Sequence, residues 1–223
     1  MDNSVHKKTK GKVMEIRDKI FSEVNMYKRL KKAAKAEELT NFEKAIDYAK
    51  TMHNGMKRKS NRYRKGTEVP YIAHPLMMAC HAHALGIKDD TVLSVIMLHD
   101  VCEECDITPE QLPFPKEITE EVKRLTKKEG QETSEYYRII GESSTASIVK
   151  ALDRVNNVST MASSFPKYKE LEYIEETEKY VYPLLDKIKI EYTDYSDAVF
   201  VIKYHLRALL ETSKCLIIGE NIN

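Results

Sequence analysis

The sequence of 223 residues contains no tryptophan and only seven glycines and seven prolines. Few residues are therefore available for the tight turns that an architecture of many short strands requires. The plentiful Lys, Glu, Ala, Leu and Met residues instead favour long helices. The longest apolar runs, such as residues 92–98, are far shorter than the roughly 20 residues that a membrane span needs. We therefore expect an all-α protein without a membrane span.

The chain also lacks a dominant charge and an apolar N-terminal segment. Its formal net charge is +1 with 32% charged residues, so bulk charge gives no argument for nucleic-acid binding. A basic stretch at residues 57–65 has neither a second basic patch nor an aromatic platform beside it, which argues against a nucleic-acid partner. Residues 1–12 are polar and basic and contain no apolar core of a signal peptide. These features predict a cytoplasmic protein.

Cysteines are few as well. The four, at Cys80, Cys102, Cys105 and Cys215, include one C-x-x-C pair, but no second Cys/His pair at a spacing suited to zinc accompanies it. Cys102 and Cys105 also lie in a helical pattern, whereas a thioredoxin-like pair follows a strand. We expect reduced thiols in or near the core.

Apolar residues at helical spacing occur through most of the chain. Asp89 or Asp90 is expected to cap a helix through residues 92–105 that is apolar nearly all round. Residues 56–66 carry six basic side chains in eleven and form a predicted cationic loop. The expected helices span residues 12–38 (as one helix or a pair), 42 to about 55, 75–85, 92–105, 109–112, 116–127, 133–142, 144–162, 167–190 and 195–214.

His99 and Asp100 lie inside the most apolar of these expected helices. An imidazole and a carboxylate near a core are costly unless they are paired, hydrogen-bonded or bound to a cation. Glu103 lies three residues after Asp100, and Glu104 lies four residues after it, so these side chains can share one helix face. Three carboxylates that close together repel one another without a cation. The pattern therefore favours a metal site.

Two further polar patterns accompany this pair. Lys150, Asp153, Asn157 and Thr160 are separated by three, four and three residues and form a polar stripe along an apolar helix. His74 stands at the expected start of a helix, shortly after the cationic loop. An isolated histidine is more often structural than a ligand, and an acidic residue before an arginine more often forms an ion pair. Taken singly, these residues leave a structural role open.

In this order, the patterns are similar to a known family. Three blocks resemble the HD-superfamily hydrolase domain of SpoT-like and small alarmone hydrolases, including their metazoan homologues. They are R-K-G-T-x-x-P-Y-x-x-H-P at residues 64–75, H-D-x-x-E-E at residues 99–104 and K-x-x-D-R-x-x-N at residues 150–157. The resemblance covers about residues 42–161. It implies an all-α HD-domain helical bundle, here with additional N- and C-terminal helices.

The resemblance also implies roles for individual residues. In that family the histidine before proline, the HD pair and the later aspartate ligate a divalent cation, usually Mn²⁺; the matching residues are His74, His99, Asp100 and Asp153. The acidic pair that orients the attacking water is matched by Glu103 and Glu104, where the second acid is usually Asp. The implied substrate-binding residues are Arg64, Lys65, Lys150, Asn157 and Thr160. Residues 57–63 resemble an insertion.

The resemblance implies a division of the chain and a reaction. Residues 1–40 are expected to form an N-terminal helical extension, residues 41–165 the HD hydrolase domain, and residues 166–223 C-terminal helices that pack on the same domain. These last helices could cover the domain, form a homodimer or close over the pocket. The implied substrate is a nucleotide, guanosine tetra- or pentaphosphate (ppGpp or pppGpp), cleaved to GDP or GTP and pyrophosphate. Two alternatives stay open: hydrolysis of another nucleotide or phosphoester, and non-catalytic nucleotide binding.

Overall fold

The computed structural model describes residues 22–58 and 69–220, and within these ranges it contains helices and no β-strand. The expectation of an all-α fold is therefore confirmed. One isolated antiparallel bridge joins Lys57 to Pro70. The elements are α2 (Glu23–Ala36), α3 (Thr40–Met52), α4 (Ala73–Ala84), α5 (Asp90–Leu98), α6 (Val101–Glu104), η1 (Pro109–Gln111), α7 (Lys116–Leu125), α8 (Thr133–Ile140), α9 (Ser144–Ser164), α10 (Lys167–Glu176), η2 (Thr177–Val181), α11 (Tyr182–Glu191), η3 (Thr193–Tyr195) and α12 (Ser196–Glu220).

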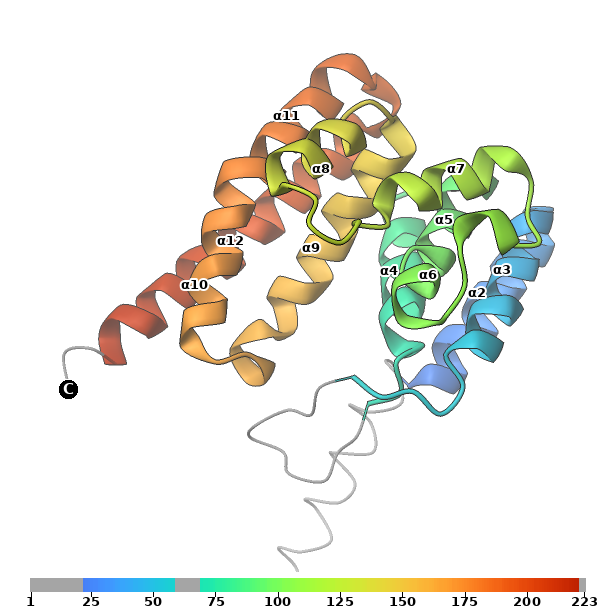
Figure 1. The fold of residues 1–223 in the computed structure, drawn as a ribbon, viewed down its shortest axis with the longest axis horizontal. Coiled ribbons are helices and arrows are strands. Elements are labelled where there is room, and N and C mark those ends of the chain that lie inside the picture. The colour runs from blue at the N-terminus through green and yellow to red at the C-terminus, as the bar shows by residue number, and fades with distance from the viewer. Residues whose placement is uncertain (1–21, 59–68, 221–223) are drawn as a thin grey trace, which may run out of the picture.

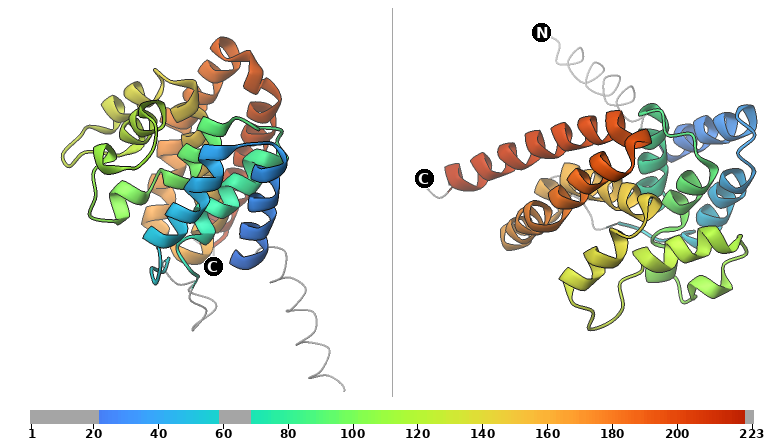
Figure 2. Two further views of the ribbon diagram at one scale, coloured as in Figure 1. Left: turned by 90° about the vertical axis from the view of Figure 1, so that its right-hand side faces the viewer. Right: turned by 90° about the horizontal axis from the view of Figure 1, so that it is seen from above.

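Helix α9 is the central element of the bundle. It packs against α4, α5 and α7 on one side and against α10, α11 and α12 on the other (Figure 1). Helices α2 and α3 cover α4 and α5 from outside, and the C-terminal end of α12 extends beyond its neighbours (Figure 2). A side chain on α9 can therefore contact either half of the bundle.

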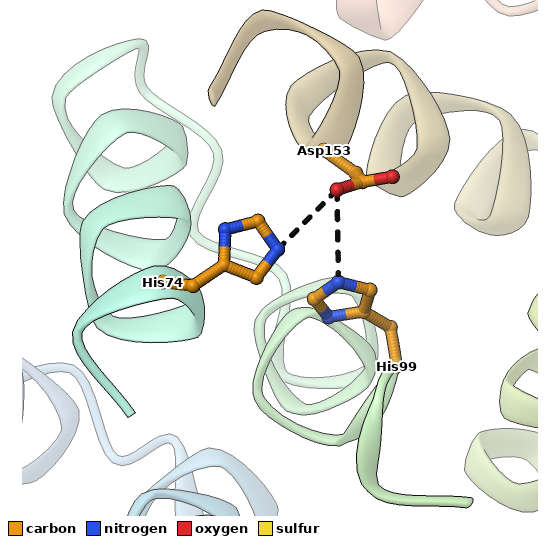
Figure 3. Close-up of side chains that lie close together, drawn as sticks. All are labelled: His74, His99 and Asp153. Carbon is orange, nitrogen blue, oxygen red and sulfur yellow. Dashed lines mark ion pairs between the residues drawn. The ribbon is translucent and has the colours of Figure 1, made fainter. Parts of the chain in front are cut away.

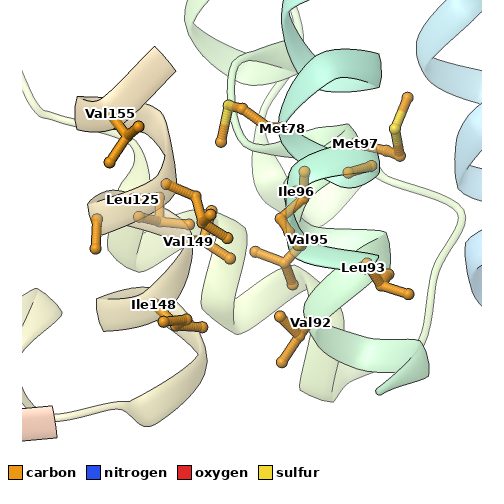
Figure 4. Close-up of a cluster of buried hydrophobic side chains, with 14 of the residues drawn as sticks. Met78, Val92, Leu93, Val95, Ile96, Met97, Leu125, Ile148, Val149 and Val155 are labelled. Carbon is orange, nitrogen blue, oxygen red and sulfur yellow. The ribbon is translucent and has the colours of Figure 1, made fainter. Parts of the chain in front are cut away.

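Helix α5 lies in the middle of the N-terminal half because it is apolar on every face. Val92, Leu93, Val95 and Ile96 are all buried; Val95 points toward Val149 of α9, and Leu93 points to the opposite side of α5 (Figure 4). Each such side chain contributes about 1.5–3 kcal/mol relative to leaving it exposed. Burial on this scale holds α5, and the His99-Asp100 pair that follows it, against α9.

The beginning of α5 is fixed by two successive carboxylates. The side chain of Asp89 accepts a hydrogen bond from the backbone nitrogen of Val92 at 2.8 Å, as expected for an N-cap. Asp90 instead reaches α3, where it accepts hydrogen bonds from the backbone nitrogens of Asn41 (3.1 Å) and Phe42 (2.8 Å). One carboxylate therefore caps α5, and the next satisfies the free donors at the start of α3.

Two expected helices are interrupted in the structure. The prediction of one continuous helix through residues 92–105 was wrong, because α5 ends at Leu98 and α6 begins at Val101. The backbone at Asp100 has φ −97° and ψ −6°, away from regular helix geometry. The stretch 167–190 contains the π-helical turn η2 before α11. Pro183 at the start of α11 cannot donate a hydrogen bond to the preceding turn, which accounts for an interruption there.

Other expectations fall on different parts of the chain. Of residues 12–38, the part before residue 22 lies outside the described residues, as do residues 59–66 of the cationic loop. The four cysteines are free; Cys215 is exposed, which departs from the expected core position, and the other three are half-buried. No helix in the described ranges is long and apolar enough to cross a membrane. The division at residues 40 and 165 stays a prediction.

Candidate metal centre and active site

Three side chains from distant parts of the sequence meet where α4, the α5–α6 turn and α9 come together (Figure 3). His74 lies in the first turn of α4, His99 lies directly after α5, and Asp153 lies in the middle of α9. The Oδ1 atom of Asp153 is 3.3 Å from Nε2 of His74 and 4.0 Å from Nε2 of His99. One donor atom from each residue lies within 4.8 Å of the others, and all three residues are buried.

The other ring nitrogen of each histidine is held by a hydrogen-bond acceptor. Nδ1 of His74 lies 2.7 Å from the side-chain oxygen of Asn156, and Nδ1 of His99 lies 2.8 Å from the carbonyl oxygen of Ile96. An acceptor opposite Nδ1 requires that this nitrogen carries the proton. Both rings therefore present Nε2, the nitrogen that faces Asp153, as the atom that can bind a metal.

Asp100 joins this cluster from the turn between α5 and α6. Its two carboxylate oxygens lie 3.1 Å from Nε2 of His99 and 3.5 Å from Nε2 of His74. The hydroxyl of Tyr71 donates a hydrogen bond to Asp100 at 2.8 Å. Because the helix is interrupted at His99 and Asp100, the side chains of both residues reach the same cluster.

The charges of the cluster shift its titration strongly. Burial alone would lower the pKa of His99, but the carboxylates of Asp100 and Asp153 outweigh burial and raise this pKa to about 9. Burial would likewise raise the pKa of Asp153, yet the Lys150 ammonium, 3.0 Å away, and His74 hold it well below its usual range. The pKa of Asp100 is also lowered, with His99 overcoming the effect of burial. The carboxylates are therefore charged and ready to bind a cation.

The donor set fits a divalent cation. Nε2 of His99 is fully buried; Oδ1 of Asp100 lies 3.1 Å away, but the two atoms lack the geometry of a regular hydrogen bond. Buried polar atoms are rarely left in that state, and a ligand is one explanation of such an atom. Two imidazole nitrogens with carboxylate oxygens are donors that borderline divalent transition metals accept. The residues that would hold such an ion are His74, His99, Asp100 and Asp153.

The two glutamates of α6 differ in their contacts. Glu104 accepts a hydrogen bond from the Tyr71 hydroxyl at 3.2 Å, so one phenol joins it to Asp100. Glu103 accepts a hydrogen bond from the backbone nitrogen of Lys127 at 2.7 Å. Burial raises the pKa of Glu103, and the charge of Asp100 adds to this effect. The hydrogen bond from the backbone of Lys127 lowers the pKa but does not outweigh burial. The structure thus places both acids beside the cluster, and neither of them in the buried His–Asp group.

Only three of the five expected substrate-binding residues lie within the described parts of the chain. Arg64 and Lys65 lie outside the described residues. Lys150 forms the ion pair with Asp153, and Asn157 donates from Nδ2 to Oδ1 of the same aspartate at 2.5 Å. The Thr160 hydroxyl lies one turn further along α9, within 3.4 Å of the backbone carbonyl oxygens of residues 156 and 157. The polar stripe expected along α9 therefore exists, with its first three members joined around Asp153.

Three residues at the centre had no role in the sequence analysis. Arg58 donates from Nη1 to Asn156 (3.3 Å) and from Nη2 to Asn157 (2.6 Å), because the bridge between Lys57 and Pro70 carries it to α9. Asn156 and Tyr71 are the other two. Tyr71 is part of the block at residues 64–75 and Asn156 lies within the block at residues 150–157, but nothing in their spacing indicates these contacts. Arg58 was one of six similar cations in a loop.

Sequence comparisons find relatives that match one half to two thirds of the chain. No family model matches it. Over 159 residues, or 67% of this chain, it is 29% identical to the guanosine-3′,5′-bis(diphosphate) 3′-pyrophosphohydrolase of Aquifex aeolicus (strain VF5), and the match covers 22% of that protein. Over 131 residues, or 55% of this chain, it is 30% identical to the human guanosine-3′,5′-bis(diphosphate) 3′-pyrophosphohydrolase MESH1, and the match covers 70% of that protein. The chain thus spans about a fifth of the bacterial relative and more than two thirds of the human one.

A solved structure gives the same fold. It is described as a metazoan ortholog of SpoT that hydrolyzes ppGpp and plays a role in starvation responses, and it matches with a TM-score of 0.59 at 20% identity over 77% of this chain and 94% of that chain. An all-α fold of this type with the His99-Asp100 pair at its centre defines an HD-domain protein. The 30% sequence identity to the human relative, over 70% of that protein, is evidence of family membership that a shared fold alone does not give. The chain belongs to the family of guanosine-3′,5′-bis(diphosphate) 3′-pyrophosphohydrolases that includes MESH1.

Proposed function

We propose that the chain is a metal-dependent phosphohydrolase that removes the 3′-diphosphate of ppGpp or pppGpp and releases GDP or GTP with pyrophosphate. The observation that carries this proposal is the buried group of His74, His99 and Asp153, whose Nε2 atoms both face the carboxylate, in a chain of this family. Ion pairs and hydrogen bonds offset part of the cost of burying this group, and the convergence of one donor atom from each of three distant residues on one point supports a cation site.

The proposed ligands are His74, His99, Asp100 and Asp153, and the proposed cation is Mn²⁺. Bound there, a divalent cation makes water a stronger nucleophile near neutral pH and polarises a phosphoryl oxygen. The mixed nitrogen and oxygen donors support an ion of this class. The ion pair of Lys150 with Asp153 supports the same assignment, because it keeps that carboxylate ionised even though it is buried.

The proposed acid–base residues are Glu103 and Glu104. A carboxylate whose pKa is raised accepts a proton from water more readily near neutral pH, which suits Glu103. Glu104 is held by the Tyr71 hydroxyl, so its position is fixed relative to Asp100. In this proposal the two carboxylates orient the attacking water and take its proton, Glu103 being held by the backbone nitrogen of Lys127 and Glu104 by Tyr71.

The proposed substrate contacts lie along α9 and in the cationic loop. We assign the polyphosphate to Arg64 and Lys65, because a guanidinium can bind phosphate through two parallel hydrogen bonds. Lys150, Asn157 and Thr160 complete the proposed substrate-binding set, and Lys150 also balances the charge of Asp153. A cytoplasmic location and a homodimer stay predictions, as does the lack of a nucleic-acid partner.

The test is product analysis of the purified full chain with ppGpp. Manganese-dependent formation of GDP and pyrophosphate in equal amounts, abolished by excess chelator, is the expected result. His99→Ala is expected to lose both bound metal and turnover while its circular dichroism spectrum is unchanged. Metal-loaded, folded protein that releases orthophosphate, or that leaves ppGpp intact while hydrolysing another nucleotide, would contradict the substrate assignment. Folded protein that binds no metal would contradict the mechanism.

A further inference from the structure

A cavity of about 540 Å³ lies between α2, α4, α9 and α12. Neither Glu103 nor Glu104, the two carboxylates of α6, lines it. Its volume is within the range of pockets that take small molecules, which is about 300–1,000 Å³. Nothing in the proposed reaction uses this cavity. Its lining is mainly apolar and includes Met26, Met77, Val155 and Leu209.

The apolar lining favours a flexible hydrocarbon. Met26 of α2, Met77 of α4 and Leu209 of α12 line the cavity from three different helices. Methionine side chains adapt to ligands of irregular shape because they are unbranched and polarizable. Burying hydrocarbon here contributes about 25 cal/mol for each Å² removed from water.

A hydrogen-bond donor stands in the wall that the cavity shares with the metal centre. Asn156 is 9% exposed and lines the cavity. Arg58 donates to its oxygen Oδ1, and a guanidinium has no acceptor, so this assignment of the amide is fixed. The remaining atom, Nδ2, makes no hydrogen bond within the described residues. It is therefore available to donate to an acceptor placed in the cavity.

The charge of the lining is positive or neutral. Arg29 of α2 lies at the cavity and forms no ion pair with any described residue. The other titratable side chains of the lining are Cys80, His81 and His205, and no carboxylate from the described ranges is among them. An anionic group placed in this cavity would therefore meet a cation and an amide donor and no opposing charge.

We propose that this cavity is a binding site for a small organic anion with an apolar body, represented by a medium-chain carboxylate. The hydrocarbon packs on the methionines and Leu209, and the carboxylate accepts hydrogen bonds from Nδ2 of Asn156 and from Arg29. The site is separate from the metal centre, and Asn156 is the residue that the two sites share. Its existence does not depend on the proposed reaction.

The experiment is calorimetric titration of the full chain, without metal or nucleotide, with octanoate and with octanamide. The two probes have the same length and differ in charge. Octanoate is expected to bind at one saturable site, about tenfold more tightly than octanamide. Arg29→Gln is expected to reduce octanoate binding to the level of octanamide. The matched control Lys28→Gln removes a neighbouring exposed charge of α2 outside the cavity and is expected to change nothing.

A second variant locates the site. Ala208→Trp places a large ring in the cavity from α12 and is expected to abolish octanoate binding. If that variant fails to fold, the comparison of Arg29→Gln with Lys28→Gln still tests whether octanoate binds in this cavity. Absence of saturable binding to the folded chain, as expected if a second copy covers the cavity, would overturn the proposal. Binding that survives Arg29→Gln, or that GDP displaces by competition, would also overturn it, since the anion would then bind elsewhere.

Discussion

Nδ1 of His74 and the side-chain oxygen of Asn156 lie 2.7 Å apart, although 82 residues separate them in the sequence. Arg58 donates to the same oxygen, and a guanidinium can only donate. The amide oxygen must therefore face His74 as an acceptor, and Nδ1 must carry the proton. The lone pair of the ring is left on Nε2, which faces Asp153. One amide thus decides which nitrogen of His74 is available to a metal.

Asn156→Ala is expected to weaken metal binding by about 10–100-fold, because the ring of His74 loses the acceptor that fixes its tautomer and orientation. Calorimetric titration with Mn²⁺ measures the change. Ser159→Ala is the matched control on the same helix, since its hydroxyl donates only to the backbone carbonyl of Asn156. An Asn156→Ala protein that binds Mn²⁺ as tightly as the parent would show that the amide does not orient the ligand.

Metal binding is expected to release a proton from His99. The carboxylates of Asp100 and Asp153 overcome burial and raise the pKa of His99 to about 9, so the ring is protonated at neutral pH in the metal-free protein. Only the neutral ring binds a metal, so the affinity should rise about tenfold per pH unit up to a pH of about 9 and then level off. Titrations in two buffers of different ionisation enthalpy measure the protons released. Zero release at neutral pH would exclude a protonated His99.

Tyr71→Phe is expected to lower kcat about tenfold with a smaller effect on KM. The lost hydroxyl donates to both Asp100 and Glu104, so the variant frees Glu104 from its position without removing any charge. Steady-state hydrolysis of ppGpp measures both constants. Tyr48→Phe is a useful comparison, because Tyr48 packs edge-to-face against Phe114 and its hydroxyl forms no hydrogen bond with Asp100 or Glu104. An equal loss in both variants would assign the effect to general destabilisation.

The helical class of the fold followed from the sequence because it depends on local periodicity. Most expected helices correspond to elements that begin or end within a few residues of the expected bounds. The helix through residues 92–105 failed for a physical reason: apolar periodicity continues across His99 and Asp100, while the backbone bends there to bring both side chains to one point. Periodicity reports which residues are buried, and it does not report where a buried chain bends.

The site was predictable to the extent that its residues lie in short ordered blocks. His74, His99 and Asp153 each belong to such a block, and the structure brings them together. Arg58 and Asn156 were missed because their role comes from the bridge that joins Lys57 to Pro70, a contact that no periodicity reveals. Residues that orient a ligand depend on tertiary contacts more than the ligands themselves do.

The last prediction concerns the polar network that holds α10 against α9 next to Asp153. Tyr137 accepts a hydrogen bond from Nη2 of Arg154 at 2.8 Å and donates one to Glu176 at 2.7 Å, while Arg154 also pairs with Glu176. Nη1 of the buried Arg154 already has no partner within the described residues. Tyr137→Phe removes a further acceptor from this cation and is expected to lower the free energy of unfolding by about 1–3 kcal/mol. Urea denaturation should show a lower midpoint at an unchanged slope.

Tyr180→Phe is the control for this prediction. Tyr180 stacks on Tyr137 with ring centroids 5.0 Å apart, and the variant should change the free energy of unfolding by less than about 0.5 kcal/mol. No loss of stability in Tyr137→Phe, or an equal loss in Tyr180→Phe, would show that the hydrogen bonds of the Tyr137 hydroxyl do not supply this stability.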